Sequence, residues 1–564
     1  MDAAGRLSAA SSRGFAVALV AAAAGLGGCG LFDFSAEARA TRMLEYEKLA
    51  LDRVQLGMAR FVFDDFGGLN TYTLETNAIA WKPVATALVV EASAREGLPI
   101  TRETLAQLLR RHGWITPGGI DNWSGLPPPR LDAPLGLVTG EIRRAVPKIR
   151  LEVANVGCAA CHAGMRYGAD GEPTGRVWLG APNTSRDFDG YLRAIVAALR
   201  YAKERPERLL EAVPKLFPDV HPDELATIRD YVLPRIFDRL DEPDGSLAAL
   251  LSFRQGGPGI TNGVAALKLR LNEVPSLLGR AEHGYTSVPD LHGRALRSSF
   301  LYDGFYSPDP AARYSARAAG ARDPLEPDRV ASIVAYFLVP TMGVHPDAPE
   351  AQASRVRDTL AFLDGYRPPP FPGPIDARRA ARGADLYAKH CAECHGTYSA
   401  AADGLHLAWF PNRLVPQSAM HTDPERWRAI TPELVRALAA RPVASKLHPA
   451  AAQGYVAPIL NGLWASAPYL HNGSVPTLWH LMRPGERPRQ FLVGGHRLDY
   501  RKVGIDGAPD GAGVYRYREG YRPWSTPVLY DTTQPGKSNA GHEAEFAPLS
   551  DAEKDDLLEF LKQL

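Results

Sequence analysis

The sequence predicts a mostly α-helical protein of several domains joined by long loops. Its 564 residues leave room for about three domains of ordinary size. Hydrophobic residues make up 45% of the chain and charged residues 23%, which is a globular rather than a disordered composition. Glycine (52) and proline (47) are both frequent. This composition predicts long connections around helices of modest length.

The amino terminus has the pattern of an export signal. A short segment with Arg6 and Arg13 precedes the apolar run Phe15–Leu26, which is too short to span the ~30 Å hydrocarbon core of a membrane. The sequence Leu26-Gly27-Gly28-Cys29 resembles the bacterial lipobox. We expect residues 1–28 to be a lipoprotein signal peptide and Cys29 to carry the lipid. The alternative is an ordinary signal peptide that is cut elsewhere.

The charge balance limits the kinds of partner. Lys and Arg total 64 and Asp and Glu total 63, which gives no support to a nucleic-acid partner. After the signal, no stretch of 18 apolar residues predicts a membrane span. We therefore expect a protein of the bacterial cell envelope that faces the periplasm and reaches the membrane only through its lipid.

Helical patterns follow along the chain. We expect an amphipathic helix over 36–57 and a helix over 101–111 with Thr101 as N-cap. Further helices are predicted over 187–203, 224–240 and 328–338, the last ending at Pro340. Residues 366–375 are rich in proline and predict a stiff linker. Helices over 376–390 and 551–564 follow, the latter with a Ser550–Glu553 capping box.

Two short motifs indicate the chemistry. Cys158-Ala-Ala-Cys161-His162 and Cys391-Ala-Glu-Cys394-His395 are both C-x-x-C-H, the pattern of covalent c-type haem attachment. Cysteines one helical turn apart lie on one face, so each can add to one vinyl group of a haem. The histidine that follows then presents a ring nitrogen to the iron.

Other uses of these cysteines fit less well. Two C-x-x-C pairs can build one four-cysteine zinc site, but zinc does not require the histidine that follows each pair. A thioredoxin-type redox pair needs a βαβ context, and we see none in the sequence. Structural disulfides suit an exported protein, but a bridge inside C-x-x-C is strained.

The two motifs and the segment after the second one resemble the di-haem cytochrome c peroxidase superfamily, which also includes methylamine-utilisation di-haem enzymes and rubber oxygenases. The most specific part is Ala467-Pro468-Tyr469-Leu470-His471-Asn472-Gly473-Ser474, which is similar to the family run A-P-Y-x-H-[DN]-G-S. A looser match is Ser299-Phe300-Leu301-Tyr302-Asp303-Gly304. Family members have a Trp where this chain has Tyr302, and that Trp lies between the haems. The resemblance makes Tyr302 a candidate relay between the haems.

The resemblance implies two cytochrome c-like haem domains with long loops, plus an N-terminal extension, in a mostly α fold. The expected boundaries are 1–28 for the signal peptide, 29–140 for the extension, 141–365 for the first haem domain, 366–375 for the linker and 376–564 for the second haem domain. The implied cofactors are two covalently bound c-type haems with His162 and His395 as proximal ligands. Some relatives carry calcium between the haem domains, which this sequence does not demonstrate.

The sequence does not identify the sixth ligand of haem 1. No histidine occurs between His162 and His221, and Met165 is too close in sequence to reach across the haem. Candidates are His221, His283 and His292, or the position is open. An open position resembles the rubber-oxygenase type, in which the first haem binds dioxygen in an apolar pocket.

The second haem has better candidates. The position at which family peroxidases supply a methionine is Gly485 here. We expect His542 as the distal ligand, because its Gly-His-Glu segment resembles the place where rubber-oxygenase-like proteins supply one. Met482 is the alternative, and Met420 and His471 are weaker candidates. Tyr469, Trp464 and Trp178 are candidates for lining the haem pockets.

These features predict an exported di-haem c-type cytochrome. As an oxidoreductase it uses haem 1 for peroxide or dioxygen chemistry and haem 2 for electron transfer, with a small cytochrome or similar protein as redox partner. The alternative is a non-enzymatic di-haem electron carrier in a periplasmic chain. A haem-based sensing module is a third possibility.

Overall fold

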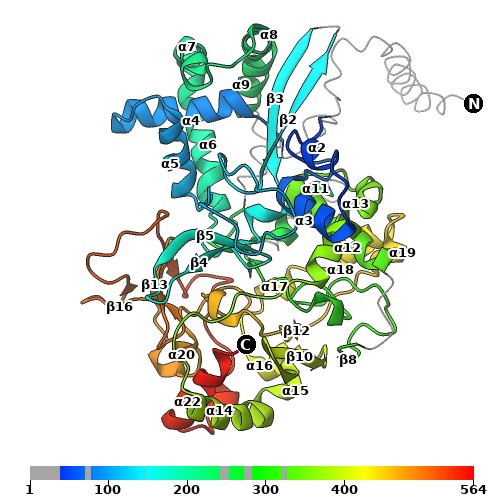
Figure 1. Cartoon of the computed structure of the whole chain (residues 1–564), viewed down its shortest axis with the longest axis vertical. Helices are drawn as coiled ribbons and strands as arrows, with labels where there is room; N and C mark the ends of the chain where they lie inside the picture. The colour runs from blue at the N-terminus through cyan, green and yellow to red at the C-terminus, as the bar shows by residue number, and fades with distance from the viewer. Residues whose placement is uncertain (1–37, 70–77, 146–147, 242–252, 272–281, 321–326) are drawn as a thin grey trace, which may run out of the picture.

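The computed structural model describes residues 38–69, 78–145, 148–241, 253–271, 282–320 and 327–564 (Figure 1). The predicted signal peptide 1–28 and Cys29 lie outside these residues. Helices account for 40% of the structure and strands for 16%. The prediction of a mostly α fold is therefore only partly right. Some connections form short hairpins, such as the one that pairs residues 163–167 with 173–179 around Gly168 and Gly171.

The elements run in the following order. Before the first Cys-x-x-Cys-His motif lie α2 (Met43–Tyr46), α3 (Arg53–Phe63), β1 (Ile79–Ala80), α4 (Trp81–Glu96), α5 (Arg102–Arg111), β2 (Leu137–Arg144) and β3 (Ile149–Val156). The first half of the chain, up to residue 365, continues with more helices than strands. Its further helices are η2 (Cys158–Ala160), α6 (Phe188–Lys203), α7 (Pro206–Leu216), α8 (Pro222–Thr227), η3 (Ile228–Val232), α9 (Leu233–Asp241), α11 (Gly263–Arg270), η5 (Arg294–Leu296), α12 (Pro327–Met342), η6 (Pro349–Gln352) and α13 (Ala353–Asp364). Its further strands are β4 (Ala163–Tyr167), β5 (Pro173–Leu179), β6 (Ile260–Thr261), β7 (Thr286–Ser287) and β8 (Arg317–Ala318).

The second half is built from shorter pieces. Its helices are α14 (Ala377–His390), α15 (Ala392–His395), α16 (Gln417–Met420), α17 (Glu425–Arg428), α18 (Pro432–Ala439), α19 (Ala444–Leu447), η7 (Leu463–Ala465), α20 (Leu478–Leu481), η8 (Pro484–Glu486), α21 (Glu543–Phe546) and α22 (Asp551–Leu561). Its strands are β9 (Thr397–Ala401), β10 (Gly404–Phe410), β11 (Leu414–Pro416), β12 (Gly454–Val456), β13 (Gln490–Val493), β14 (Leu498–Asp499), β15 (Gly504–Ile505), β16 (Ala508–Pro509), β17 (Tyr515–Arg516) and β18 (Val528–Asp531).

Several predicted helix starts agree with the structure, because local capping chemistry sets them. The Thr101 hydroxyl accepts a hydrogen bond from the Thr104 N–H at the start of α5. The Asp187 carboxylate accepts one from the Gly190 N–H and begins α6. The predicted capping box at Ser550 begins α22.

Two predicted helices are wrong in extent, and a third has the expected extent but an irregular turn. The helix expected over 36–57 is interrupted, and α3 starts anew at Arg53 because Asp52 forms its own capping box. The helix expected to end at Pro340 continues to Met342, since a proline in the last turn removes only one helical hydrogen bond. The helix expected over 224–240 contains the π-helical turn η3, a feature that often marks functional regions.

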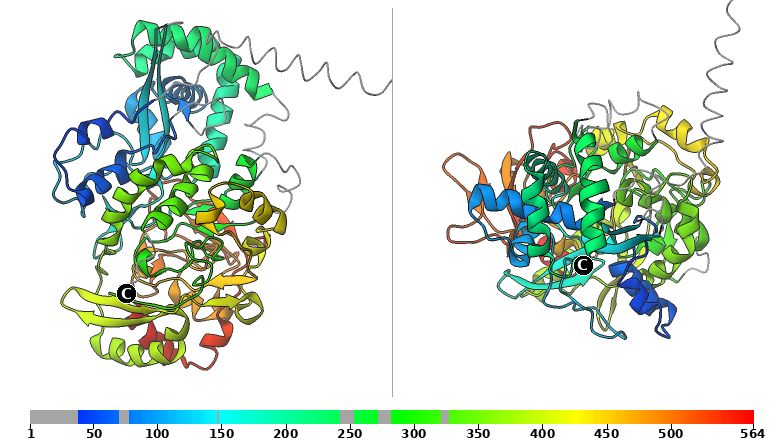
Figure 2. Two further views of the ribbon diagram at one scale, coloured as in Figure 1. Left: turned by 90° about the vertical axis from the view of Figure 1, so that its right-hand side faces the viewer. Right: turned by 90° about the horizontal axis from the view of Figure 1, so that it is seen from above.

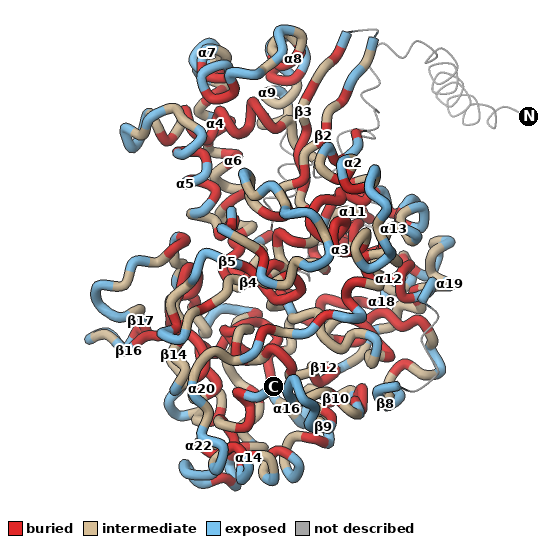
Figure 3. The backbone as a smooth tube through the Cα atoms, in the orientation of Figure 1, coloured by how far each residue is buried: buried red, intermediate tan, exposed pale blue. Residues whose placement is uncertain are grey.

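Two lobes lie at opposite ends of the molecule. At one end the hairpin β2–β3 stands beside α4 and α6 to α9, and at the other end lie α14 and α22 (Figures 1 and 2). The hairpin is paired from Leu137–Val156 to Arg144–Ile149, and β1 joins the free edge of β3. Figure 3 shows buried residues on both strands and along α4.

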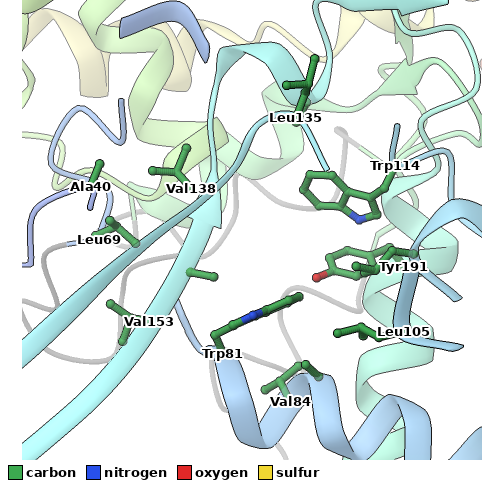
Figure 4. Packing of buried hydrophobic residues seen from close by; sticks show 14 of the residues in the cluster. Ala40, Leu69, Trp81, Val84, Leu105, Trp114, Leu135, Val138, Val153 and Tyr191 are labelled. Carbon is green, nitrogen blue, oxygen red and sulfur yellow. The ribbon is translucent and has the colours of Figure 1, made fainter. Parts of the chain in front are cut away.

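Aromatic residues fill the core beside this hairpin. Trp81 and Val84 of α4, Leu105 of α5, and Tyr191 of α6 gather near Trp114 on one side (Figure 4). Smaller side chains, Ala40, Leu69, Val138 and Val153, gather on the other side. Burial alternates along β2, so one face of the hairpin is buried, which fixes its register.

The opening and closing helices of the second half cross closely. A Cβ on Gly383 of α14 would collide with the Asp556 carbonyl oxygen of α22. Beside the crossing, the Tyr387 and Phe560 rings lie 5.0 Å apart, and Arg379 pairs with Asp556 at 2.9 Å. The last helix of the chain thus packs directly on the opening helix of the second half.

An equivalent crossing occurs in the first half, between α3 and α13. A Cβ on Gly57 would collide with the Asp358 carbonyl oxygen, and the Phe61 and Phe362 rings lie 5.5 Å apart. Arg60 pairs with Asp358 at 3.2 Å. By this likeness α3 is the opening helix of the first half, and residues 65–156 are inserted between it and the first motif. The predicted boundary at residue 141 falls inside this insertion, within β2, and so assigns α3 and the first motif to different domains.

None of the helices in the described ranges combines the length and the hydrophobicity that a bilayer span requires.

Candidate haem sites

The first Cys-x-x-Cys-His motif forms the tight turn η2 after β3. The His162 N–H donates to the Cys158 carbonyl at 3.0 Å, and the Asn183 N–H donates to the Cys161 carbonyl at 2.7 Å. A Cβ on Gly136 would collide with the Ala160 main chain. The inserted lobe therefore rests directly on the motif, and only glycine permits this approach.

The second motif continues directly from α14. The His395 N–H donates to the Cys391 carbonyl at 2.9 Å. The His395 Nδ1 lies 2.8 Å from the Pro458 carbonyl oxygen, which identifies Nδ1 as the protonated nitrogen and leaves the Nε2 lone pair free. Burial lowers the pKa of His395, so the ring is neutral. This is the arrangement that a metal-binding imidazole requires.

Two loops, 287–306 and 456–475, have the same backbone path. Left-handed residues occur at Gly293, Leu301 and Gly304 in the first loop and at Gly462, Leu470 and Gly473 in the second. Each loop has an isolated antiparallel bridge, Phe300–Tyr306 in one and Tyr469–Val475 in the other. Pro289 and Pro458 are equivalent, and each carbonyl raises the pKa of one motif's histidine, but only Pro458 lies within hydrogen-bond distance, since His162 Nδ1 has no hydrogen-bond partner. Sequence reasoning missed this repeat, although P-x-L-x-G occurs in both loops.

The two loops exchange main-chain hydrogen bonds. The Ser287 N–H donates to the His471 carbonyl at 2.7 Å, and the Val456 N–H donates to the Tyr302 carbonyl at 2.7 Å. Ser287 is equivalent to Val456 and Tyr302 to His471, so the exchange is reciprocal. The two halves are therefore related by a local twofold axis where Tyr302 and His471 meet.

His542 faces the second motif. Its ring and that of His395 are nearly parallel, with an interplanar angle of 22° and centroids 6.3 Å apart. Burial lowers the pKa of His542 to about 3, so it is also neutral. An iron bound by both rings would be about 2 Å from one nitrogen of each ring. Adding the distance from each nitrogen to the centre of its ring gives about the observed separation of the two centroids. The pair fits an iron held between the two rings.

The other candidates for haem 2, His471, Met482 and Met420, also line the cavity. His471 stacks on Tyr455 at 4.2 Å and lies beside Tyr302 at 6.4 Å. Met482 is buried at the end of α20, and Met420 ends α16. Gly485 lies in η8, where a Cβ would have open space.

His162 has a different environment. Burial lowers its pKa to about 4. All fifteen histidines of the chain belong to the described residues, and among these none stacks opposite His162 as His542 does opposite His395. His221 caps α8 at the surface, and His283 packs against Tyr285. His292 lines the cavity, with Nδ1 held 3.0 Å from the Tyr366 carbonyl oxygen.

A cavity of about 1660 Å³ contains both motifs. Cys158, Cys161, His162, Cys391, Cys394, His395 and His542 all contribute to its wall. It extends to the inserted residues, where its apolar wall includes Val84, Trp114 and Leu151 of the insertion together with Tyr191 and Ile195 of α6 and Ile236 of α9. Tyr302 and Tyr469 also line it, whereas Trp464 and Trp178 pack outside, against the 366–375 segment.

The donor set fits c-type haem at both motifs. The four cysteines are unpaired thiols, as thioether attachment requires, and this gives no support to the disulfide alternative. Within the described ranges, no group of three or more His, Cys, Asp or Glu side chains could hold a separate metal ion.

Comparisons with known proteins agree with this chemistry. Residues 378–456 match the family model described as cytochrome C oxidase, cbb3-type, subunit III, and residues 454–492 match the model described as RoxA-like, cytochrome c-like. Both matches lie within residues 378–492, and they support a c-type cytochrome with covalently bound haem and a redox or electron-transfer function, related to the RoxA-like family. They give no separate support to the wider di-haem peroxidase superfamily.

Two relatives come from Sinorhizobium fredii (strain NBRC 101917 / NGR234), and both are described only as uncharacterised. The chain is 36% identical to protein y4iM over 198 residues, which cover 32% of this chain and 45% of that protein. It is 29% identical to protein y4iJ over 266 residues, which cover 36% of this chain and 42% of that protein. The chain thus spans less than half the length of either relative.

Proposed function

We propose that this protein is an exported di-haem c-type cytochrome that acts as an oxidoreductase. In this proposal Cys158, Cys161 and His162 hold haem 1, and Cys391, Cys394 and His395 hold haem 2. The local twofold relation between the halves supports two equivalent sites. The separation of His395 and His542 carries the proposal, because the two imidazoles would together hold haem 2, which would then supply electron transfer, and exchange chemistry would fall to haem 1.

Haem 1 is proposed to keep an exchangeable sixth position. A haem of this kind supplies the site at which peroxide or dioxygen reacts. Burial of His162 holds the proximal imidazole neutral, because it lowers the pKa of the ring to about 4. The apolar side chains of the inserted lobe exclude water from the neighbouring part of the cavity. Tyr302, at the crossing of the two loops, is proposed as the relay between the haems.

The proposal extends to location and partners. Cys29 is proposed as the lipid attachment site on the periplasmic side of the cell envelope, and a small cytochrome or similar protein as the redox partner. The Cys29→Ala variant should move the protein from the membrane fraction to the soluble periplasmic fraction. Retention in the membrane fraction would contradict the lipid anchor.

The absorption and EPR spectra of the oxidised and half-reduced protein, with and without cyanide, test the function. We expect one low-spin haem whose spectrum cyanide does not change and one high-spin haem that cyanide converts to low spin. In His542→Ala a second cyanide-sensitive haem should appear. Two low-spin haems unaffected by cyanide in both redox states would favour the non-enzymatic electron carrier instead.

The number of haems needs its own measurement. A pyridine haemochrome assay should give two haems per chain for the wild type, and one for each variant in which a single cysteine pair is replaced by alanine. One haem in the wild type would contradict the di-haem proposal.

A further inference from the structure

The ring of His542 is not fixed by a hydrogen bond of its own. Its Nδ1 is buried and has no hydrogen-bond partner, unlike the Nδ1 of His395. Its ring neighbours are His395 and Phe546, the latter with centroids 6.2 Å apart. The main chain must therefore determine where this ring points.

That main chain has an unusual conformation. His542 has a φ of 68°, in the left-handed region, and Gly541 before it has a φ of 124°. A residue other than glycine rarely adopts such a conformation unless surrounding contacts hold it there. Contacts from outside the loop must therefore stabilise it.

Arg487 makes those contacts. Its side chain is only 3% exposed. Nη1 donates to the Asn539 carbonyl at 2.5 Å and to Glu543 Oε1 at 2.7 Å. Nη2 donates to the Gly541 carbonyl at 2.9 Å. Three of its bonds thus hold the segment on both sides of His542.

The remaining donors attach this segment to α20. Nη2 donates to the Leu481 carbonyl at 2.7 Å, and Nε donates to the His480 carbonyl at 3.3 Å. All five N–H groups of the guanidinium are therefore used. Glu543 adds to the arrangement, because its two carboxylate oxygens both accept from the Gly541 N–H at 2.9 Å.

We propose that Arg487 is the positioning residue that holds His542 over haem 2. It connects α20 to the 539–543 loop through a fork of five fixed donors. This inference rests on the proposed function, in which His542 is the sixth ligand of haem 2. A lysine has one nitrogen and cannot span these acceptors, so the planar geometry of arginine matters as well as its charge.

The test compares the spectra and imidazole affinity of purified haem-loaded variants. Arg487→Met and Arg487→Lys should both lose most of the low-spin signal of haem 2. Imidazole should bind haem 2 at least about tenfold more tightly than in the wild type, because the site is no longer mostly closed. The spectrum of haem 1 should stay unchanged.

A matched control is Arg313→Met. Arg313 is also buried and donates to main-chain carbonyls, those of Gly304, Phe305 and His448, none of which belongs to α20 or to the 539–543 loop. Its replacement should leave haem 2 low-spin. If Arg487→Met does not fold, Glu543→Ala, which keeps the arginine, should show a smaller gain in imidazole affinity.

The outcomes separate the two proposals. If His542→Ala leaves haem 2 low-spin, the assignment of the ligand fails and the proposed function must change. If His542→Ala opens haem 2 but Arg487→Met leaves it closed, the ligand stands and the positioning role is overturned. A low-spin haem 2 in Arg487→Lys would show that charge suffices and would overturn the geometric argument.

Discussion

Tyr302 and His471 lie at equivalent positions of the two loops, with ring centroids 6.4 Å apart, and the carbonyl of each accepts a hydrogen bond from the opposite loop. The Tyr302 hydroxyl lies 3.0 Å from the Ser287 hydroxyl. Both rings line the cavity that contains the two motifs. Tyr302 is thus part of the contact between the halves, where a relay would have to lie.

The first prediction concerns this position. Tyr302→Leu removes the ring, so electron exchange between the haems should slow by about tenfold or more, while each haem keeps its own spectrum. Tyr302→Phe keeps the ring, loses only the bond to Ser287, and serves as the control. Rapid reduction followed by stopped-flow spectroscopy measures the rate. Equal rates in both variants would exclude an aromatic relay at this position.

The second prediction concerns the buried guanidinium of Arg186, which lies near Cys161 of the first motif. Arg186 is 1% exposed and lies 3.8 Å from the Trp114 ring centroid, 4.2 Å from that of Phe188 and 4.9 Å from that of Tyr191. Its Nε and Nη2 have no hydrogen-bond partner, and burial lowers its pKa to about 10. A cation in a low-dielectric site beside the first motif favours the ferrous state of the haem.

Arg186→Met should therefore lower the midpoint potential of haem 1 by about 60 mV, a tenfold change in a one-electron equilibrium. Arg186→Lys keeps the charge and should retain most of the potential. Spectroelectrochemical titration measures both haems in the same sample. An equal shift of haem 2 would point to general destabilisation rather than a local field.

The third prediction concerns pH. Asp290 accepts hydrogen bonds from the Tyr366 hydroxyl at 2.7 Å and from the His292 N–H at 2.8 Å, and burial raises the pKa of its carboxyl to about 7. The folded protein keeps this proton between about pH 4 and 7, where the unfolded chain has lost it. Its contribution to stability should therefore fall as pH rises through this range and then level off.

In Asp290→Asn the neutral amide resembles the protonated carboxyl, so the fall in the free energy of unfolding with rising pH should disappear. Urea unfolding of the wild type and the variant at pH 5 and pH 8 measures the difference. The variant should gain stability relative to the wild type at the higher pH. A constant difference between the two pH values would show that Asp290 does not titrate in this range.

The fourth prediction concerns the helix crossing in the second half. In Gly383→Ala the new methyl group meets the Asp556 carbonyl, so the free energy of unfolding should fall by about 1–3 kcal/mol. Gly263→Ala is the control, because it lies at the start of α11 with nothing within 4 Å of the added carbon. That variant should be neutral or slightly more stable. Similar losses in both would mean that the crossing is not tight.

The sequence by itself determined what depends on neighbouring residues. The C-x-x-C-H spacing defines the attachment chemistry, since both thiols and the imidazole lie within five positions. Thr101, Asp187 and Ser550 set helix starts through side chains that reach only three residues ahead. The candidate distal ligand His542 came from a resemblance to a family segment, and its ligation stays a prediction.

Only the tertiary structure decided which distant segments meet. The facing rings of His395 and His542, the hold of Arg487 on the 539–543 loop, and the reciprocal bonds of Tyr302 and His471 all join residues far apart in the chain. The pairing of α3 with α13 was hidden because residues 65–156 separate α3 from its motif. Periodicity and capping report local conformation, whereas these contacts depend on how whole elements pack.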